Sequence, residues 1–125
     1  MESALRVFRY LKGASGQGLF FSSNSDFKLR AYCDSDWVGC PLTRRSTMGY
    51  CVFLGPSLIS WRSKRQKIVS LSSAEVEYRA MTGACCELTW LRYLLRDLGL
   101  SHHESALLYC DNKAALHIAA NPVFY

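Results

Sequence analysis

The sequence predicts an α/β fold in which three antiparallel strands precede a long helix, a fourth strand and a short helix. Apolar and polar residues alternate over residues 27–33, which indicates a half-buried strand. An amphipathic pattern then extends over residues 72–98, and a short apolar run follows at residues 106–110. Because a strand–helix–strand crossover normally joins parallel strands, we expect the fourth strand to run parallel to the first.

Size and composition indicate one ordered domain. The chain has 125 residues, of which 50% are hydrophobic and 20% charged, and this excludes a disordered chain. The formal charge of +5 is compatible with a polyanionic partner and equally with an ordinary basic domain. No apolar run approaches the length of a membrane span, and charged residues interrupt any secretory signal. We therefore expect an intracellular protein, in the cytoplasm or the nucleus, that is not secreted and contacts no membrane.

The six cysteines are expected to be free thiols. An even number in a short chain is compatible with a disulfide scaffold. Cys33, Cys51 and Cys110, however, lie in apolar strand-like runs, where a free cysteine behaves as a small hydrophobe. No pair has the spacing of a zinc knuckle. The sequence therefore favours a reducing compartment.

The N-terminal segment looks separate from the rest of the chain. Residues 3–12 form an amphipathic helical pattern that Gly13 closes, and residues 13–18 are linker-like. A short strand at residues 19–22 is the next expected element. We therefore divide the chain into a connector, residues 1–24, and a domain, residues 25–125.

The first three strands form an expected antiparallel meander. The first is residues 27–33, and the second is residues 49–54, which Gly55-Pro56 ends. The third is residues 58–61, with residues 67–70 continuing it past a basic bend. Short loops between consecutive strands favour antiparallel pairing.

The long helix is expected to begin at Ser72 and to end before Gly99. Ser72 suits an N-cap, and Glu75, three residues on, suits a capping box. At about 100° per residue, one face of this helix collects six apolar residues, namely Ala80, Met81, Ala84, Leu88, Leu91 and Leu95. A last helix is expected at residues 113–120, stopped by Asn121-Pro122.

Glu77 lies on the apolar stripe of the long helix, where a carboxylate is unexpected. Glu75 points roughly 160° away and has a structural role at the capping box. Burial of an acid without a neighbouring cation costs stability, so Glu77 needs a partner. That partner is either a metal ion or a basic residue at the margin of the core.

Asp34 and Asp111 follow the first and fourth strands. If these strands are parallel neighbours, both acids emerge at one edge of the sheet, where open α/β sheets bind ligands. Asp36 lies on the same side as Asp34, so spacing alone does not choose between them, and both also suit a turn. Asp111 also suits a helix N-cap.

Three converging carboxylates are typical of a site for hard divalent cations. Carboxylate oxygens suit Mg²⁺ or Mn²⁺, and two such ions about 4 Å apart promote phosphodiester hydrolysis. Serine or cysteine nucleophiles lack a good histidine partner, because His102 and His103 fall in a loop and His117 in the last helix.

Basic residues flank the second and third strands. With Trp37, Tyr50 and Trp61 they are candidates for a nucleic-acid groove, and the alternative is ordinary solvated loop charge. The set comprises Arg44, Arg45, Arg62, Lys64, Arg65 and Lys67.

Five strings of residues carry a resemblance to one family. They are AYCDSDWVGC (31–40), RRSTMGYCVFLG (44–55), ISWRSK (59–64), SSAEVEYRA (72–80) and YCDNKAA (109–115). Together they resemble the ribonuclease H domain of copia-type long-terminal-repeat retrotransposon Pol polyproteins, over about residues 27–122. Residues 5–13 (LRVFRYLKG) also resemble the segment that joins reverse transcriptase to this domain.

The resemblance implies a ribonuclease H-like fold and metal-dependent hydrolysis of the RNA strand of RNA–DNA hybrids. Asp34, Glu77 and Asp111 would be the catalytic, metal-binding residues, with Asp36 and Glu75 as second choices, and Mg²⁺ or Mn²⁺ as the cofactor. Asn112 and the basic residues would contact the nucleic acid. The reverse transcriptase portion of the same polyprotein would be a further partner.

The chain departs from the family at its C-terminal end. The family has a fourth carboxylate near the start of a final helix, beyond a fifth strand, and residues 121–125 fall before that point. We therefore expect the fifth strand and final helix to be missing. The alternative to a ribonuclease H is a truncated, non-catalytic retroelement remnant with at most weak nucleic-acid binding.

Overall fold

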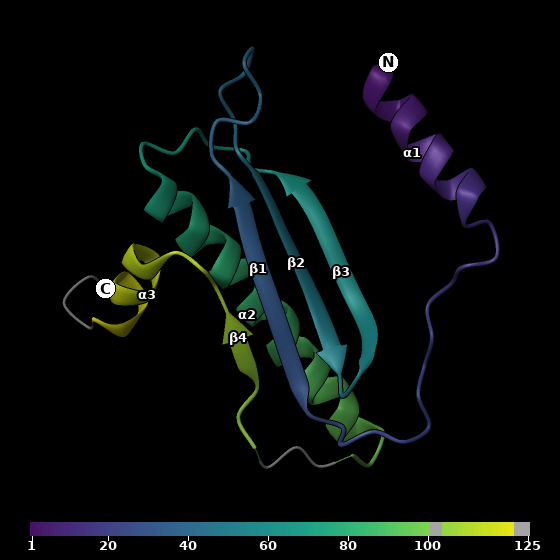
Figure 1. Ribbon diagram of the computed structural model, residues 1–125. Helices are drawn as coiled ribbons and strands as arrows, with labels where there is room; N and C mark the ends of the chain where they lie inside the picture. The colour runs from purple at the N-terminus through teal and green to yellow at the C-terminus, as the bar shows by residue number, and fades with distance from the viewer. Residues whose placement is uncertain (101–103, 122–125) are drawn as a thin grey trace.

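A computed structural model describes residues 1–100 and 104–121, which form a four-stranded mixed sheet with helices (Figure 1). The strand order is β3-β2-β1-β4, and α2 crosses one face of the sheet. In chain order the elements are α1 (Glu2–Gly13), β1 (Leu29–Asp36), β2 (Thr47–Leu54), β3 (Ser57–Arg65), α2 (Ser73–Asp97), β4 (Leu107–Tyr109) and α3 (Lys113–Ala120).

The pairing of the strands confirms the predicted fold class. β1 pairs antiparallel with β2, and β2 with β3, as in the expected meander. β1 pairs parallel with β4, with Tyr32 opposite Tyr109. The crossover through α2 therefore brings the ends of β1 and β4 to the same edge of the sheet.

The core lies between the sheet and the apolar stripe of α2. All six stripe residues predicted from the sequence are buried, and they form two clusters. Leu88, Leu91 and Leu95 pack on Leu29 and Val52, and the smaller Ala80 and Ala84 pack near Cys33 and Ala115. The small residues let α2 approach the ends of β1 and α3 closely, and this is the end of the helix that carries Glu77.

The termini of α2 agree with the sequence signals. The Ser72 side chain accepts a hydrogen bond from the Glu75 backbone N–H at 3.2 Å, so Ser72 is the N-cap. Gly99 has a φ of +85°, in the left-handed region that glycine tolerates best, and its N–H donates to the Arg96 carbonyl at 3.0 Å.

Several strand boundaries differ from the prediction. Residues 19–22 do not form a strand, and residues 67–70 do not extend β3. β3 instead continues through the expected basic bend to Arg65, because residues 62–65 pair in register with residues 47–50 of β2. β1 begins at Leu29 and runs to Asp36, so Asp34 lies inside the strand and does not end it.

β4 was expected to be a buried strand over residues 106–110, and this was wrong in two respects. It has only three residues, and both Leu107 and Tyr109 are about half exposed. Their side chains lie on the sheet face opposite α2, where Tyr32 stacks on Tyr109 with ring centroids 4.9 Å apart. No described element covers this face, so its apolar residues remain in contact with solvent.

The N-terminal helix lies apart from the sheet in Figure 1, and every residue of α1 is exposed. The chain reaches the sheet at Ser22, whose N–H donates to Ser57 Oγ at 3.1 Å. Gly55 forms the turn between β2 and β3 with a φ of +57°. A Cβ at this position would also collide with the Ser25 side chain, so the turn requires glycine.

Candidate active site

Asp34 lies on β1, two residues before its end, beside the N-terminal half of α2. Its side chain is on the exposed sheet face, and the next residue, Ser35, faces α2. The Ser35 backbone N–H donates to Asp34 Oδ1 at 2.8 Å and to Glu77 Oε1 at 3.2 Å. One N–H therefore joins a carboxylate of the sheet to a carboxylate of the helix.

Glu77 is buried, with 6% of its surface exposed, on the same stripe of α2 as the core residues. The sequence-based alternative paired this acid with a basic residue. Among the described residues, however, no ion pair to Glu77 is found. Its other carboxylate oxygen, Oε2, is approached by the Cys110 thiol at 3.9 Å.

Asp111 follows β4 and lies beside Glu77. One oxygen of Asp111, one oxygen of Glu77 and the Cys110 sulfur lie within 4.8 Å of one another. The N-cap of α3 is Asn112, whose Oδ1 accepts from the Ala115 N–H at 3.0 Å. The alternative in which Asp111 is the N-cap is therefore wrong, and its carboxylate is not used for capping.

Electrostatics link the three acids. Burial raises the pKa of Glu77 above that of an ordinary carboxyl, and the negative charges of Asp34 and Asp111 raise it further. Hydrogen bonding from Ser35 opposes this increase only in part. The site therefore concentrates negative charge around a buried carboxylate that makes no ion pair with the residues the structure describes.

Ser35 places an unsatisfied hydroxyl at this site. Its Oγ is buried and makes no hydrogen bond of good geometry, although the residue lies directly against Glu77. Buried polar atoms without a partner are rare in proteins. Carboxylate oxygens gathered around a buried acid that makes no ion pair within the described residues, beside an unpartnered hydroxyl, fit a hydrated divalent cation.

The two second-choice acids, Glu75 and Asp36, make contacts outside the cluster around Glu77. Glu75 accepts from the Leu71 N–H at 3.0 Å and pairs with Arg79 at 2.9 Å, and these bonds lower its pKa. Asp36 is exposed at the end of β1. Its carboxylate lies against Gly39 and occupies the space that a side chain at residue 39 would need. Glu75 therefore has a structural role at the start of α2, although it accepts from the Leu71 N–H and not from the N–H of the N-cap Ser72, as a capping box would require.

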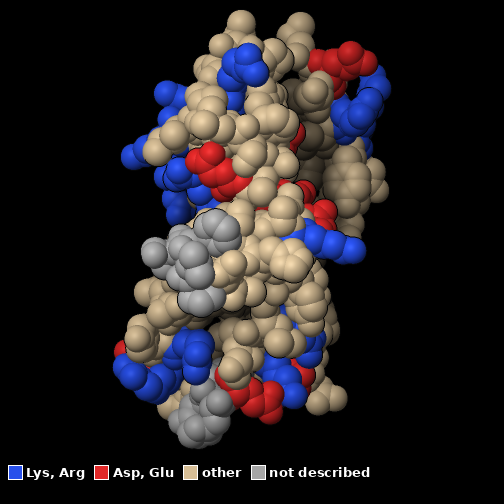
Figure 2. Space-filling model, turned by 90° about the vertical axis from the view of Figure 1, so that its left-hand side faces the viewer, with Lys and Arg blue, Asp and Glu red and all other residues tan. Residues whose placement is uncertain are grey.

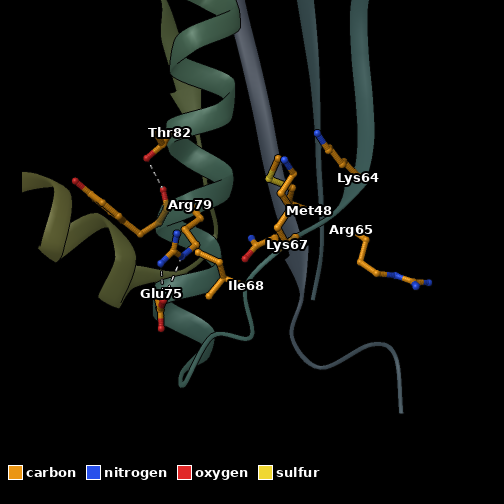
Figure 3. A pocket seen from close by; sticks show the side chains of 10 residues that line it. Met48, Lys64, Arg65, Lys67, Ile68, Glu75, Arg79 and Thr82 are labelled. Atoms are coloured by element: carbon orange, nitrogen blue, oxygen red, sulfur yellow. Dashed lines mark hydrogen bonds and ion pairs between the residues drawn. The ribbon is translucent and has the colours of Figure 1, made fainter. Parts of the chain in front are cut away.

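The predicted basic residues are divided among several places. Lys64, Arg65 and Lys67 line a cavity of about 520 Å³ between the end of β3 and α2, together with Arg79. Figure 3 shows Lys64 extending from β3 toward the helix side, whereas Arg65 extends away from it. Arg79 of α2 was not expected from the sequence, because it looked like an ordinary exposed helix residue.

The remaining candidates do not share one groove. Arg62 lies on β3 opposite Tyr50, on the face that α2 covers, whereas Arg44 and Arg45 lie in the loop before β2. Trp61 is opposite Cys51, so it lies on the other sheet face from Tyr50. The expected groove lined by Trp37, Tyr50 and Trp61 together is therefore not formed.

One face of the molecule is mixed in charge. Figure 2 shows Asp and Glu side chains interspersed with Lys and Arg in both the upper and the lower half of this face. This arrangement would let basic groups contact a polyanion while acidic groups hold cations.

The environments of the cysteines predict very different reactivities. All six are free. Hydrogen bonding from the side chain and backbone of Thr43 lowers the pKa of Cys40 to about 7, whereas burial raises the pKa of Cys33 to about 12. Since the thiolate is the reactive form, Cys40 should react fastest with iodoacetamide, with a rate that is half-maximal near pH 7.

Labelling followed by peptide mass spectrometry tests this prediction. Thr43→Ala should raise the pKa of Cys40 and slow its labelling at neutral pH. Cys40→Ser should remove the fast phase. Persistence of that phase in Cys40→Ser would show that another thiol carries it.

Two further expectations concern the membrane and the histidines. Within residues 1–100 and 104–121, no helix combines the length and apolar character that a membrane crossing needs. His102 and His103 lie outside the described residues, and His117 is in α3.

Comparison with known proteins finds similarity to transposon polyproteins. The retrovirus-related Pol polyprotein from transposon RE2 of Arabidopsis thaliana is 44% identical over 96% of this chain. The corresponding polyprotein from transposon TNT 1-94 of Nicotiana tabacum is 38% identical over 99% of it. The chain spans only 8% and 9% of the lengths of these two relatives.

A shorter relative and two negative results complete the comparison. Secreted RxLR effector protein 161 of Plasmopara viticola is 46% identical over 72% of this chain, which spans 63% of that relative. No family model and no solved structure matches the chain. The homologues that align over nearly the whole chain are thus Pol polyproteins from transposons, and this chain is similar to a short segment of them.

Proposed function

We propose that this chain is a ribonuclease H-like domain that hydrolyses the RNA strand of an RNA–DNA hybrid with Mg²⁺ or Mn²⁺. The observation that carries the proposal is the cluster around Glu77. A buried acid with two neighbouring acids, and no ion pair to it among the described residues, makes a site that a bound cation would stabilise. The similarity to retrotransposon Pol polyproteins supports a substrate that arises in reverse transcription.

Asp34, Glu77 and Asp111 would hold the cation. When bound, it would polarise a phosphoryl oxygen and stabilise the leaving oxygen of the RNA backbone. The Ser35 N–H orients the carboxylates of Asp34 and Glu77 toward each other, and the packing of α2 on β1 fixes their separation. The chain thus supplies ligands that are held in place before substrate arrives.

The basic residues would grip the nucleic-acid backbone by charge without reading its sequence. Lys64 and Lys67 lie at the cavity beside the N-terminal half of α2, the half that carries Glu77. In an intact element, the reverse transcriptase portion of the polyprotein would deliver the hybrid to this domain. We expect the protein to act inside the cell, in the cytoplasm or the nucleus.

A cleavage assay tests the proposal. The purified chain is incubated with an RNA–DNA hybrid labelled on the RNA strand, with Mg²⁺, with Mn²⁺, or with EDTA. Metal-dependent cleavage of RNA in the hybrid, and not of single-stranded RNA, is expected. Asp34→Asn should abolish cleavage, because it removes a ligand charge and preserves side-chain shape.

Asp97→Asn is the matched control, because Asp97 is an exposed acid at the far end of α2 that pairs with Arg96 at 3.7 Å. Equal cleavage by Asp34→Asn and the parent would indicate a contaminating nuclease. Binding without cleavage in the parent would favour the non-catalytic remnant, and the hydrolase proposal would fall.

Lys64→Ala should weaken hybrid binding for all sequences alike. A plot of log K against log salt concentration has a negative slope, and the loss of one phosphate contact reduces the magnitude of this slope by about 0.7–0.9. Fluorescence anisotropy across a salt series measures this slope. Lys28→Ala is the matched control, since Lys28 pairs with Glu104 at 3.1 Å at the opposite end of the sheet. An equal loss of hybrid affinity in Lys64→Ala and Lys28→Ala would show that Lys64 makes no specific contact with the phosphate backbone.

A further inference from the structure

We propose that Cys110 gives the acidic site a thiolate ligand, so that Glu77, Cys110 and Asp111 bind Zn²⁺ more tightly than Mg²⁺. The inference rests on the carboxylate site of the proposed function and adds a regulation to it. Zn²⁺ would occupy the site in competition with Mg²⁺ and inhibit cleavage.

The separations of the ligand atoms suit a small cation. The sulfur of Cys110 and one oxygen from each carboxylate lie within 4.8 Å of one another. Tetrahedral Zn²⁺ with a sulfur at about 2.3 Å and an oxygen at about 2.1 Å separates these two atoms by roughly 3.6 Å. The observed distance from Cys110 Sγ to Glu77 Oε2 is 3.9 Å, so this pair of ligand atoms needs a shift of only a few tenths of an ångström to share the ion.

The backbone holds Cys110 at the site. Cys110 directly follows β4, whose last residue, Tyr109, pairs with Tyr32 of β1. The Cys33 thiol donates to the Tyr109 carbonyl at 3.6 Å, which further fixes the peptide before Cys110. The thiol of Cys110 therefore stays on the α2 side of the sheet, against Glu77.

The burial of one member of the cluster and a neighbouring hydroxyl group indicate that a ligand fits here. Glu77 is only 6% exposed and has no basic partner among the described residues. The Ser35 Oγ beside it is buried and unpartnered. A cation with bound water would satisfy both groups, the first by charge and the second by a hydrogen bond.

The thiol determines which cation is preferred. Mg²⁺ takes oxygen ligands almost exclusively, whereas Zn²⁺ is borderline soft and binds thiolate, imidazole and carboxylate. Binding of Zn²⁺ would release the Cys110 thiol proton to solvent and form a Zn–S bond, with no oxidation or reduction. Two carboxylates and one thiolate leave a fourth position for water.

Cd²⁺, which forms thiolate bonds with an ultraviolet charge-transfer absorption, serves as the probe. The exposed or reactive Cys40, Cys85 and Cys86 are first replaced by Ser in the full chain to remove competing thiols. Cd²⁺ is then titrated into this background, and Zn²⁺ and Mn²⁺ affinities are measured by calorimetry. Cys110→Ser is compared with Cys51→Ser, a half-exposed cysteine on the other sheet face.

In the background protein and in Cys51→Ser, we expect a charge-transfer band that saturates at one Cd²⁺ per chain. Cys110→Ser should lose the band and bind Zn²⁺ at least about tenfold more weakly, since a thiolate ligand is gone, while its Mn²⁺ affinity changes little. A band that survives in Cys110→Ser, an unchanged Zn²⁺ affinity, or no band in the background protein would each overturn the inference.

The two proposals fail separately. A chain that shows the Cys110-dependent band but cleaves no hybrid retains the zinc site and loses the proposed hydrolase function. A chain that cleaves hybrid with Mg²⁺ but shows no such band, and is not inhibited by Zn²⁺, keeps the hydrolase function and loses the zinc site.

Discussion

Glu77→Gln should stabilise the metal-free protein while abolishing metal-dependent cleavage. Glu77 is buried among like charges, so its ionised form costs free energy in the folded state. Glutamine removes the charge and keeps an oxygen that can accept the Ser35 N–H. We expect a gain of roughly 1 kcal/mol, which raises the melting temperature by about 3–6 °C for a domain of this size.

The pH dependence of this gain follows from the raised pKa of Glu77. Below the ordinary carboxyl pKa, Glu77 is protonated in both the folded and the unfolded state, so its charge costs nothing and glutamine brings no advantage. The cost appears as pH rises and is complete above the raised pKa of the folded state. Thermal melts near pH 4 and near pH 7 should therefore differ in the size of the gain.

Added Mg²⁺ should reverse the ranking of the two proteins. A cation that binds only the folded state raises the free energy of unfolding of the wild type by RT ln(1 + [L]/Kd). Glu77→Gln should lose most of this stabilisation. Asp97→Asn should behave as the wild type in every condition. A Glu77→Gln protein that melts below the wild type without metal would show that the carboxylate is satisfied by the fold itself.

Leu91→Ala should destabilise the domain by about 2–5 kcal/mol. Leu91 lies at the centre of the larger core cluster and is 6% exposed, between Leu88 and Leu95 on the helix and Leu29 on β1. Its truncation leaves a cavity that neighbouring strands cannot fill without moving. A loss of this size is a large part of the total stability of a small domain.

Urea unfolding followed by circular dichroism measures this loss. Leu94→Ala is the matched control, because Leu94 lies on the same helix but is 39% exposed. Its substitution should change the free energy of unfolding by less than about 1 kcal/mol. Equal effects at both positions would mean that α2 does not pack on the sheet through the stripe that contains Leu91.

The sequence by itself determined the element order, the buried face of α2 and the parallel pairing of β1 with β4. Each of these follows from a local pattern: alternation over β1, a 3.6-residue period in α2, and the handed geometry of a crossover. The capping signal at Ser72 was equally local. The angle of roughly 160° between residues two apart on a helix separated Glu75 from Glu77.

Only the tertiary structure decided what surrounds Glu77. No sequence pattern shows that one Ser35 N–H joins Asp34 to Glu77, or that Cys110 approaches the same carboxylate, because these contacts cross between strands and helix. The choice of Asn112 as N-cap depended on where β4 ends, and the continuation of β3 to Arg65 depended on pairing with β2. Local propensities carry no information about which distant segments pair. For this reason the prediction gathered the basic residues around one groove, whereas the fold distributes them over several places.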